Sequence, residues 1–457
     1  MGKMDTTGKS ISNGTLTSLC DEFRKNNRID AKKFEQYDVK RGLRNADGSG
    51  VMAGLTMICN VHGYVINEGE KSPVEGRLVY RGIDVRELVA GCVAEDRFGY
   101  EETVWLLLFG KLPTRAQLDK FCELLSAYRE LPEYFAEDMI IKAPSPNIMN
   151  KLARSVLALY SYDNNPEELS MENVLRQSIE LIARLPTIMA YAYQVKRRHY
   201  DKESMYFHPL VPGQSTSETI LHALRDDSVF TDKEAKLLDL CLMLHAEHGG
   251  GNNSTFAARV LSSSGTDTYS AIAAAIGALK GPLHGGANIK VMQMMQAVKE
   301  GVRNWDDDDE IKAFLTKIIN KEAGDGSGKI YGMGHAVYTL SDPRAIILKQ
   351  YAYDVAEEKG YGAEFRLTEA VERLTPAVFA EQKGSDKVLC ANVDMYSGLV
   401  YTALGIHPDL FTPLFAVARM AGWCAHRIEE LLTGGRIIRP AYKAIAKQQE
   451  YIPLSER

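Results

Sequence analysis

The sequence lacks the features that mark several classes of protein. Its 457 residues contain no run of about eighteen apolar residues, so no segment has the length of a membrane-spanning helix. Residues 1–16 are polar and have no apolar core of a signal peptide. The formal net charge of −6 leaves no basic footprint for nucleic acid. We therefore expect a soluble chain that binds neither a membrane nor a nucleic acid.

Paired cysteines are also missing. The chain has seven cysteines, an odd number, and no Cys-x-x-Cys pair, so it shows no disulfide framework. This use of cysteine is typical of a reduced, cytoplasmic protein. The seven are Cys20, Cys59, Cys92, Cys122, Cys241, Cys390 and Cys424.

What is present is the composition of an ordinary globular protein, with 45% apolar and 25% charged residues. The length suits about two to four domains of about 150 residues each. Residues 1–50 are polar and turn-rich, and they predict an arm rather than a domain. Over residues 55–80, short β-prone runs alternate with glycine, asparagine and proline, which predicts one or two small hairpins.

The remainder of the chain has mostly helical periodicity. In residues 114–129, Thr114 and Gln117 form a capping box, and Phe121 and Leu125 recur on one face. Similar patterns predict helices over 151–162, 173–196, 234–248, 287–300, 310–322, 343–358, 366–382 and 411–432. The sequence therefore predicts an all-α fold with small N-terminal β hairpins.

Three segments place histidine among glycines: residues 245–252, 281–288 and 332–337. Histidine is the side chain whose pKa lies nearest neutrality, and flanking glycines let a ligand approach the backbone closely. Because the combination recurs three times, it indicates a site that is formed to bind a ligand.

The first segment carries His245 and His248 on one face of the helix predicted over 234–248, with Gly249 as a stop. The partial negative charge of a helix C-terminus favours the imidazolium form, which suits a carboxylate ligand. Two satisfied core histidines explain these residues equally well. A metal site is the weaker alternative, because the sequence has no second ligand cluster such as an HExxH helix.

The second segment places His284 just before the helix predicted over 287–300, where the helix dipole disfavours a positive charge. A neutral histidine can donate a hydrogen bond to a carbonyl oxygen and so stabilise a developing enolate. A structural turn histidine is the alternative.

The third segment carries His335, and Asp342, Pro343 and Arg344 follow as a helix N-cap, a proline at N1 and an arginine. A guanidinium at a helix start would hold a carboxylate through two parallel bonds. We expect His335 and Arg344 to face one ligand, although a solvated surface arginine remains the alternative for Arg344.

Asp394 adds a carboxylate, because it follows a β-prone approach and precedes Ser397 and Gly398. It could be a turn-forming residue or a general base. A neutral donor, a cationic anion holder, an arginine fork and a base are the four roles needed to form a carbon–carbon bond α to a thioester.

At these residues the chain resembles the citrate synthase family, and the likeness covers nearly everything after residue 50. It includes residues 80–84 (Tyr-Arg-Gly-Ile-Asp), 107–113 (Leu-Leu-Phe-Gly-Lys-Leu-Pro), 186–191 (Pro-Thr-Ile-Met-Ala-Tyr) and 439–440 (Arg-Pro). The resemblance implies an enzyme that condenses oxaloacetate with acetyl-CoA through an enol and then hydrolyses the thioester to citrate and CoA.

The resemblance also implies residue roles. Asp394 would remove the acetyl methyl proton, His284 would stabilise the enol, and His335 would polarise the oxaloacetate ketone. The remaining matched positions would bind substrate: His248, Arg344, Arg419, Arg439 and Phe415 at oxaloacetate, and Ile330, Gly332, Gly334, Lys387 and Asn392 at CoA. Acetyl-CoA would be a co-substrate, and the family implies no bound cofactor and no metal.

The fold implied by the resemblance is helical, with a large domain and a smaller one that closes over oxaloacetate. We expect an arm over 1–50, a large domain over 51–283 plus 405–457, and a small domain over 284–404. Because Arg439 would reach the site of a neighbouring subunit, the protein would be at least a homodimer.

Other activities fit the same residues. A 2-methylcitrate synthase would use propionyl-CoA, and one methylene changes discrimination in an apolar pocket by only about 1–3 kcal/mol. A ligand-sensing relative without catalysis is a more remote alternative, because it would not need His284, His335 and Asp394 together. A metal-dependent hydrolase is a further one. The sequence leaves open the choice between dimer and hexamer and any regulation by NADH or ATP.

Overall fold

A computed structural model describes residues 13–68, 70–384 and 388–457, and its chain packs into two units. The first unit ends at Leu55 and contains α1 (Asn13–Asn26), α2 (Lys32–Gln36) and the 3₁₀ turn η1 (Arg41–Leu43). The predicted arm over 1–50 thus contains two helices that periodicity did not indicate. The second unit, from Thr56 to Arg457, holds all the other elements.

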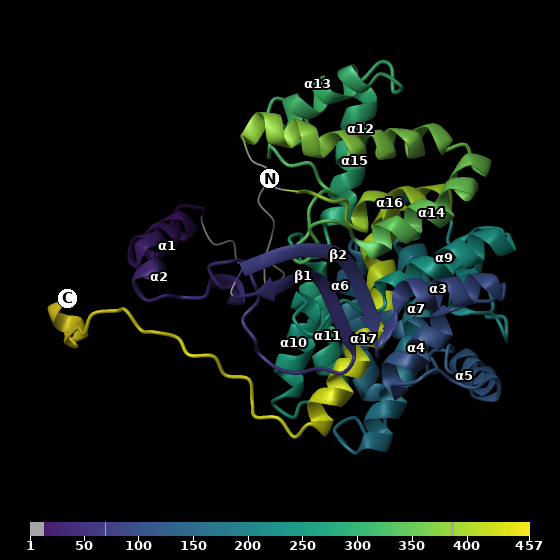
Figure 1. The fold of residues 1–457 in the computed structure, drawn as a ribbon. Helices are drawn as coiled ribbons and strands as arrows, with labels where there is room; N and C mark the ends of the chain where they lie inside the picture. The colour runs from purple at the N-terminus through teal and green to yellow at the C-terminus, as the bar shows by residue number, and fades with distance from the viewer. Residues whose placement is uncertain (1–12, 69, 385–387) are drawn as a thin grey trace. The chain divides into compact units, whose positions relative to one another are not determined.

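The second unit is mainly helical, which confirms the predicted fold class (Figure 1). The helices that the periodicity predicted are α5 (Arg115–Ala127), α6 (Ile148–Leu159), α7 (Met171–Lys196), α9 (Asp232–His245), α12 (Ala287–Gly301), α13 (Asp308–Ile319), α14 (Pro343–Glu358), α15 (Gly362–Lys383) and α17 (Phe411–Leu432). Helix α5 begins with the predicted capping box of Thr114 and Gln117.

Among the described residues of the second unit, six further helices had no clear pattern in the sequence. They are α3 (Val85–Ala94), α4 (Tyr100–Phe109), α8 (Thr216–Leu224), α10 (Asn253–Ser262), α11 (Thr268–Lys280) and α16 (Asp394–Ala403). Single turns of 3₁₀ or π helix complete the set: η2 (Ala136–Ile141), η3 (Tyr160–Tyr162), η4 (Arg197–Asp201), η5 (Pro408–Leu410) and η6 (Leu454–Glu456).

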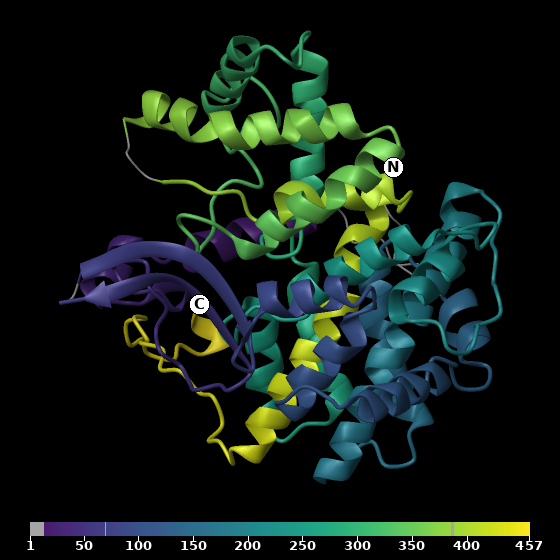
Figure 2. The ribbon, with the colours of Figure 1, turned by 45° about the vertical axis from the view of Figure 1, so that its right-hand side comes forward.

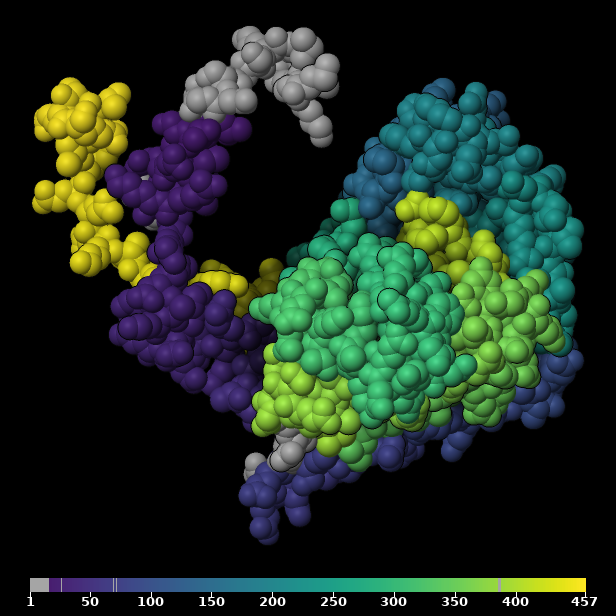
Figure 3. Space-filling view, turned by 90° about the horizontal axis from the view of Figure 1, so that it is seen from above, coloured from purple at the N-terminus to yellow at the C-terminus, as the bar shows by residue number. Residues whose placement is uncertain are grey.

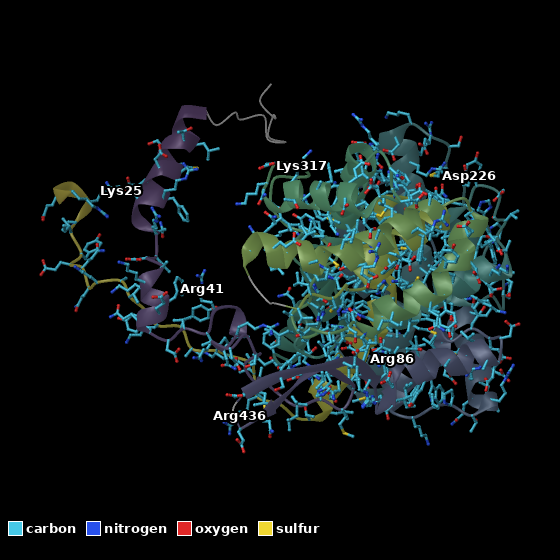
Figure 4. All side chains as sticks on the ribbon, turned by 45° about the horizontal axis from the view of Figure 1, so that its top comes forward. Lys25, Arg41, Arg86, Asp226, Lys317 and Arg436 are labelled. Carbon is cyan, nitrogen blue, oxygen red and sulfur yellow. The ribbon has the colours of Figure 1, made fainter. Side chains whose placement is uncertain are left out.

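The predicted hairpin is a three-stranded antiparallel sheet in the order β1 (Cys59–Asn67), β2 (Glu70–Tyr80) and β3 (Ile83–Asp84). Its strands lie against the backbone just after His335: a Cβ at Gly63 would come within 2.7 Å of the Val337 carbonyl oxygen, and one at Gly76 within 2.0 Å of that of Ser341. Only glycine permits such an approach. Arg86, labelled in Figure 4, ties α3 to this sheet by donating to the Gly76 carbonyl at 2.9 Å.

Helix α17 forms the centre of the core. Its residues from Phe411 to Ile428 are almost all buried, and it packs against α4, α7, α9, α10 and α11. Figure 2 shows α17 in yellow running between these helices. Because α17 is enclosed on several sides, any polar side chain that it carries is removed from water.

Helices α12 to α16 form a second group, packed chiefly on one another. They lie together at the top of Figure 1 and cover the face shown in green in Figure 3. Helix α14 also packs against α3, α9 and β2, so it joins the two groups. The predicted division into domains at 284 and 404 stays a prediction.

After Leu432 the chain continues without a helix or strand as far as η6, and its side chains are mostly exposed. Within the described residues, no helix combines the length and the apolarity needed to cross a membrane. All seven cysteines are free thiols.

Candidate active site

The end of α9 is fixed by a tyrosine from the sheet. The helix ends at His245, one turn earlier than predicted, so His248 lies in the loop beyond it. The Tyr80 hydroxyl, fully buried, lies 3.1 Å from the carbonyl oxygens of both Met243 and Glu247 and caps this helix end. The loop that carries His248 is therefore anchored where it leaves the helix.

His245 is fully buried and His248 is half-buried, and their ring nitrogens are poorly satisfied. The His245 ring stacks on Phe415 with centroids 4.3 Å apart, and the His248 ring stands at 85° to the His335 ring at 5.1 Å. Both ring nitrogens of His245 and Nε2 of His248 have no hydrogen-bond partner among the described residues. Buried polar atoms normally have partners, so these atoms indicate a ligand site.

The predicted positive charge on His248 is wrong. Burial, followed by the charge of Arg344, holds the pKa of His248 well below its ordinary value. Burial and the same arginine lower the pKa of His245 in the same direction. Because His248 lies beyond the last helical turn, the helix dipole does not compensate for its desolvation, and both rings are neutral at pH 7.

Arg419 contacts the carbonyl of His245 and the ring of Phe415. It is fully buried on α17, its Nε donates to the His245 carbonyl at 2.6 Å, and both Nη atoms have no partner among the described residues. Burial lowers its pKa, while the carboxylate of Glu247 opposes that shift. The guanidinium stands over the Phe415 ring at 4.7 Å. Two unpaired, buried Nη groups are suited to a carboxylate ligand.

Arg344 is at the predicted helix start but is already paired. Asp342 is the N-cap of α14, and its carboxylate accepts the Arg344 backbone N–H at 3.0 Å, as predicted. The same carboxylate also accepts Nε at 3.0 Å and Nη2 at 2.7 Å of the Arg344 side chain. Burial would lower the pKa of Arg344, but Asp342 outweighs burial and raises it. The Nε–H and Nη2–H groups of Arg344 are therefore already bonded to Asp342, so the prediction that this edge of the side chain holds a ligand carboxylate through two parallel bonds is wrong.

The backbone that follows His335 selects its tautomer. The backbone N–H groups of Val337 and Tyr338 both donate to His335 Nδ1, each at 3.1 Å. Because Nδ1 is the acceptor, a neutral His335 carries its proton on Nε2. The ring stacks on Tyr338 with centroids 4.6 Å apart. His335 thus presents an Nε2–H donor.

His284 has the opposite tautomer. The Ser254 backbone N–H donates to His284 Nε2 at 3.3 Å, which leaves the proton on Nδ1. Burial, followed by the charge of Arg419, lowers the pKa of His284 to about 4, so the predicted neutral state is confirmed. Ser254 was not predicted, and Trp423 holds its hydroxyl through an N–H bond of 3.1 Å. Its place in the Asn-Asn-Ser run after the His248 glycines is the signal that could have found it.

Asp394 is the first residue of α16, so the turn reading was wrong. Its backbone N–H donates to Asn392 Oδ1 at 3.0 Å. Burial raises the pKa of Asp394 to about 6, and the positive charge of Arg344 opposes this rise. A carboxylate with a pKa close to neutrality suits a general base.

Four of the five residues predicted at CoA come together. Asn392 donates to the carbonyl oxygens of Gly332 and Gly334, from its backbone N–H and Nδ2 respectively, both at 2.8 Å. Gly332 and Gly334 have φ of +81° and +89°, which favours glycine. Ile330 is buried at the start of this segment. Lys387 lies outside the described residues.

The structure does not place Arg439 beside the other candidate residues. It is exposed in the C-terminal segment, and among the described residues it has no hydrogen bond or ion pair with the candidate residues. The neighbouring Ile438 N–H donates to Ser263 Oγ at 3.1 Å, at the end of α10.

The assembled groups support one kind of chemistry. Arg419 can hold a carboxylate, His335 Nε2–H can polarise a carbonyl, and Asp394 can accept a proton from carbon. His284 Nδ1–H can then stabilise the enolate oxygen without losing its own proton. These groups share one electrostatic environment, because the charge of Arg419 acts on the pKa values of His248, His284 and Asp394.

Comparison with known proteins agrees with this chemistry. The family model described as citrate synthase, C-terminal domain, matches residues 47–441. The chain is 34% identical to a citrate synthase of Synechocystis over 90% of this chain and 93% of the relative, and 35% identical to one of Deinococcus radiodurans over 84% and 93%. A 2-methylcitrate synthase of Shewanella oneidensis is 32% identical over 83% and 92%.

Solved structures give the same result. The citrate synthase of Pyrobaculum aerophilum matches with a TM-score of 0.73 and 30% identity, over 90% of this chain and 94% of that chain. The citrate synthase of Thermoplasma acidophilum, in a ternary complex with carboxymethyl coenzyme A and oxaloacetate, matches with a TM-score of 0.73 and 26% identity, over 92% and 99%.

Proposed function

Because this chain belongs to the citrate synthase family, we propose that it condenses oxaloacetate with acetyl-CoA and hydrolyses the resulting citryl-CoA to citrate and CoA. One observation carries this proposal. The buried, unpaired Nη groups of Arg419 lie in one site with two histidines of opposite tautomer and with a carboxyl whose pKa is about 6.

Oxaloacetate is the first substrate in this proposal. Arg419, His248 and the remaining N–H groups of Arg344 hold its carboxylates, and Phe415 packs beside it. His335 donates its Nε2–H to the ketone oxygen, which makes the ketone carbon electrophilic. A dianion in contact with His248 would also raise the pKa of that ring from its lowered value.

Acetyl-CoA reacts second. Asp394 removes a proton from the acetyl methyl group while His284 Nδ1–H stabilises the oxygen of the enol. The carbon nucleophile formed in this way then attacks the ketone carbon of oxaloacetate. The resulting alkoxide oxygen takes the proton of His335 Nε2–H, and the proton that Asp394 removed replaces it, so that both groups return to their starting states. Water finally cleaves the thioester and releases CoA. Ile330, Gly332, Gly334 and Asn392 receive CoA, together with Lys387.

The cellular setting belongs to the same proposal. A homodimer would allow Arg439 of one subunit to reach the oxaloacetate of its partner, which fits its position outside the site of its own chain. The seven free thiols support a reducing, cytoplasmic location. We place the reaction in the tricarboxylic acid cycle, with acetyl-CoA as co-substrate and with neither a bound cofactor nor a metal ion.

The test measures CoA thiol release by the purified protein without added metal. We expect release from acetyl-CoA only when oxaloacetate is present. A parallel assay with propionyl-CoA tests the second candidate, which the similarity to the Shewanella 2-methylcitrate synthase favours. A higher kcat/KM for propionyl-CoA would replace the citrate assignment with 2-methylcitrate, and no release from either thioester would overturn both.

A further inference from the structure

A chain of buried polar side chains runs from the residue before His248 to the surface of α17. Glu247 is fully buried, and its Oε1 accepts the backbone N–H of Gly249 at 2.5 Å. The same Oε1 accepts Nε2–H of His426, on α17, at 3.0 Å. The side chain of Glu247 therefore fixes the backbone on the far side of His248 and is itself fixed by His426.

Arg259, on α10, determines the tautomer of His426. Its Nε and Nη2 lie 3.1 and 2.7 Å from His426 Nδ1. Because a guanidinium can only donate, Nδ1 is the acceptor and the proton of a neutral His426 is on Nε2, facing Glu247. Arg259 in turn binds Glu430 at 2.7 Å and also pairs with Glu429.

The backbone of Gly422 and Gly250 packs closely against these hydrogen-bonded side chains. A Cβ at Gly422 of α17 would lie 2.0 Å from Glu247 Oε2, and a Cβ at Gly250 would lie 3.3 Å from Cε1 of His426. The carboxylate of Glu247 is therefore enclosed by backbone as well as held by hydrogen bonds. Its Oε2 is buried and has no hydrogen-bond partner among the described residues, so the bonds through Oε1 alone decide its orientation.

These contacts hold His248 from both sides. Tyr80 lies 3.1 Å from the Glu247 carbonyl oxygen, just before His248, and the Glu247 side chain binds the Gly249 N–H, just after it. In the part of the chain that the structure describes, the ring of His248 has no hydrogen-bond partner at Nε2 that could orient it instead. We infer that Glu247, held by His426 and Arg259, is a positioning residue that fixes His248 for oxaloacetate binding. The inference rests on the proposed function, in which His248 binds oxaloacetate.

The test compares two substitutions at His426. His426→Leu removes both hydrogen bonds, whereas the amide of His426→Gln can donate to Glu247 and accept from Arg259. The dissociation constant of oxaloacetate is measured by calorimetry, and the KM for acetyl-CoA and kcat at saturating oxaloacetate are measured by CoA release. We expect His426→Leu to weaken oxaloacetate binding about tenfold or more, with His426→Gln within about threefold of the wild type.

Both other constants should change by less than about threefold, because His248 contacts only oxaloacetate in the proposed mechanism. His199→Leu, at an exposed histidine on η4, controls for loss of an imidazole elsewhere and should leave all values unchanged. Should His426→Leu fail to fold, Arg259→Met tests the same chain, because it removes the donor that orients His426 while Glu247 and His426 remain.

The possible results distinguish a failure of this inference from a failure of the proposed function. Wild-type oxaloacetate affinity in folded His426→Leu or Arg259→Met would overturn the inference, as would an equal loss in His426→Gln and His426→Leu. A wild-type protein that binds oxaloacetate but releases no CoA would overturn the proposed function alone, because calorimetry would still report on His248.

Discussion

The two sides of the candidate site satisfy their polar groups differently. On the helix side, formed by α17 and the loop that leaves α9, Arg419 and His248 keep buried nitrogens that have no partner among the described residues. On the loop side, His284 and His335 each have one ring nitrogen that accepts a hydrogen bond from a backbone N–H. The helix side thus leaves unpaired polar groups for an anion, whereas the loop side fixes which nitrogen donates a proton.

The loop histidines show what the backbone adds. Ser254 bonds Nε2 of His284 and leaves Nδ1–H, whereas Val337 and Tyr338 bond Nδ1 of His335 and leave Nε2–H. A backbone N–H bonded to one ring nitrogen therefore makes Nδ1 the donor in His284 and Nε2 the donor in His335. If the comparison is right, substitutions on the loop side, where Asp394 also lies, should lower kcat. Substitutions on the helix side should weaken oxaloacetate binding.

The largest effect should come from the proposed base. Asp394→Asn keeps the shape of the side chain but removes the proton acceptor, so we expect kcat to fall by about 10²-fold to 10⁴-fold. Oxaloacetate affinity, measured by calorimetry, should stay within about threefold of the wild-type value. Retained turnover would remove Asp394 from the role of base, and lost oxaloacetate binding would end the division between the two sides.

The next largest effect should come from Arg419. Arg419→Met removes a buried charge whose Nη groups have no partner within residues 13–68, 70–384 and 388–457, so oxaloacetate should bind about 30-fold to 3,000-fold more weakly. Thermal stability of the ligand-free protein should be kept or increased, because no desolvated charge remains at this position. A large fall in the unfolding midpoint would show that the arginine is structural. Arg427→Met on the same helix is the matched control, because Arg427 donates to Thr268 and Ser262, and it should lose stability.

The pH dependence of kcat/KM for acetyl-CoA should reflect the ionisation of one group, the carboxyl of Asp394. Burial raises the pKa of Asp394 to about 6, and the base acts only when ionised, so kcat/KM for acetyl-CoA should fall as pH drops through 6, about tenfold per unit below it. His284, with its pKa lowered to about 4, stays neutral over that range. A profile that is flat from pH 5 to 8 would contradict the raised pKa of Asp394.

Periodicity predicted α5 and also α17, although α17 is buried over most of its length, but it missed α11. Helix α5 has a capping box and one apolar face, and both were visible in the sequence. Helix α11 buries Tyr269, Ile272, Ile276 and several alanines around most of its circumference, so its sequence shows no polar face. Helices of that kind carry little periodic signal.

The electrostatics of the site were predicted only in part: the neutral state of His284 was correct, whereas the charge of His248 and the free side chain of Arg344 were not. The helix start at Asp342 and Arg344 was visible, yet the pairing of their side chains was not, because an N-cap carboxylate can bind the backbone alone. The charge of His248 was inferred from a helix dipole, whereas burial decided it. Ser254 acts through a backbone N–H, which its residue type does not reveal, so only its place after the His248 glycines could have indicated this contact.

The smallest effect should be at a helix end that touches neither side of the site. The Thr114 hydroxyl accepts the Gln117 N–H at 3.3 Å, and Gln117 Oε1 accepts the Thr114 N–H at 2.9 Å. Thr114→Ala should cost about 1 kcal/mol of stability, measured by thermal unfolding, and Thr114→Ser should restore it. Oxaloacetate affinity and kcat should both be unchanged. A kinetic change in Thr114→Ala would mean that scaffold stability alone alters the site, and the losses expected at Asp394 and Arg419 could then no longer be assigned to one side or the other.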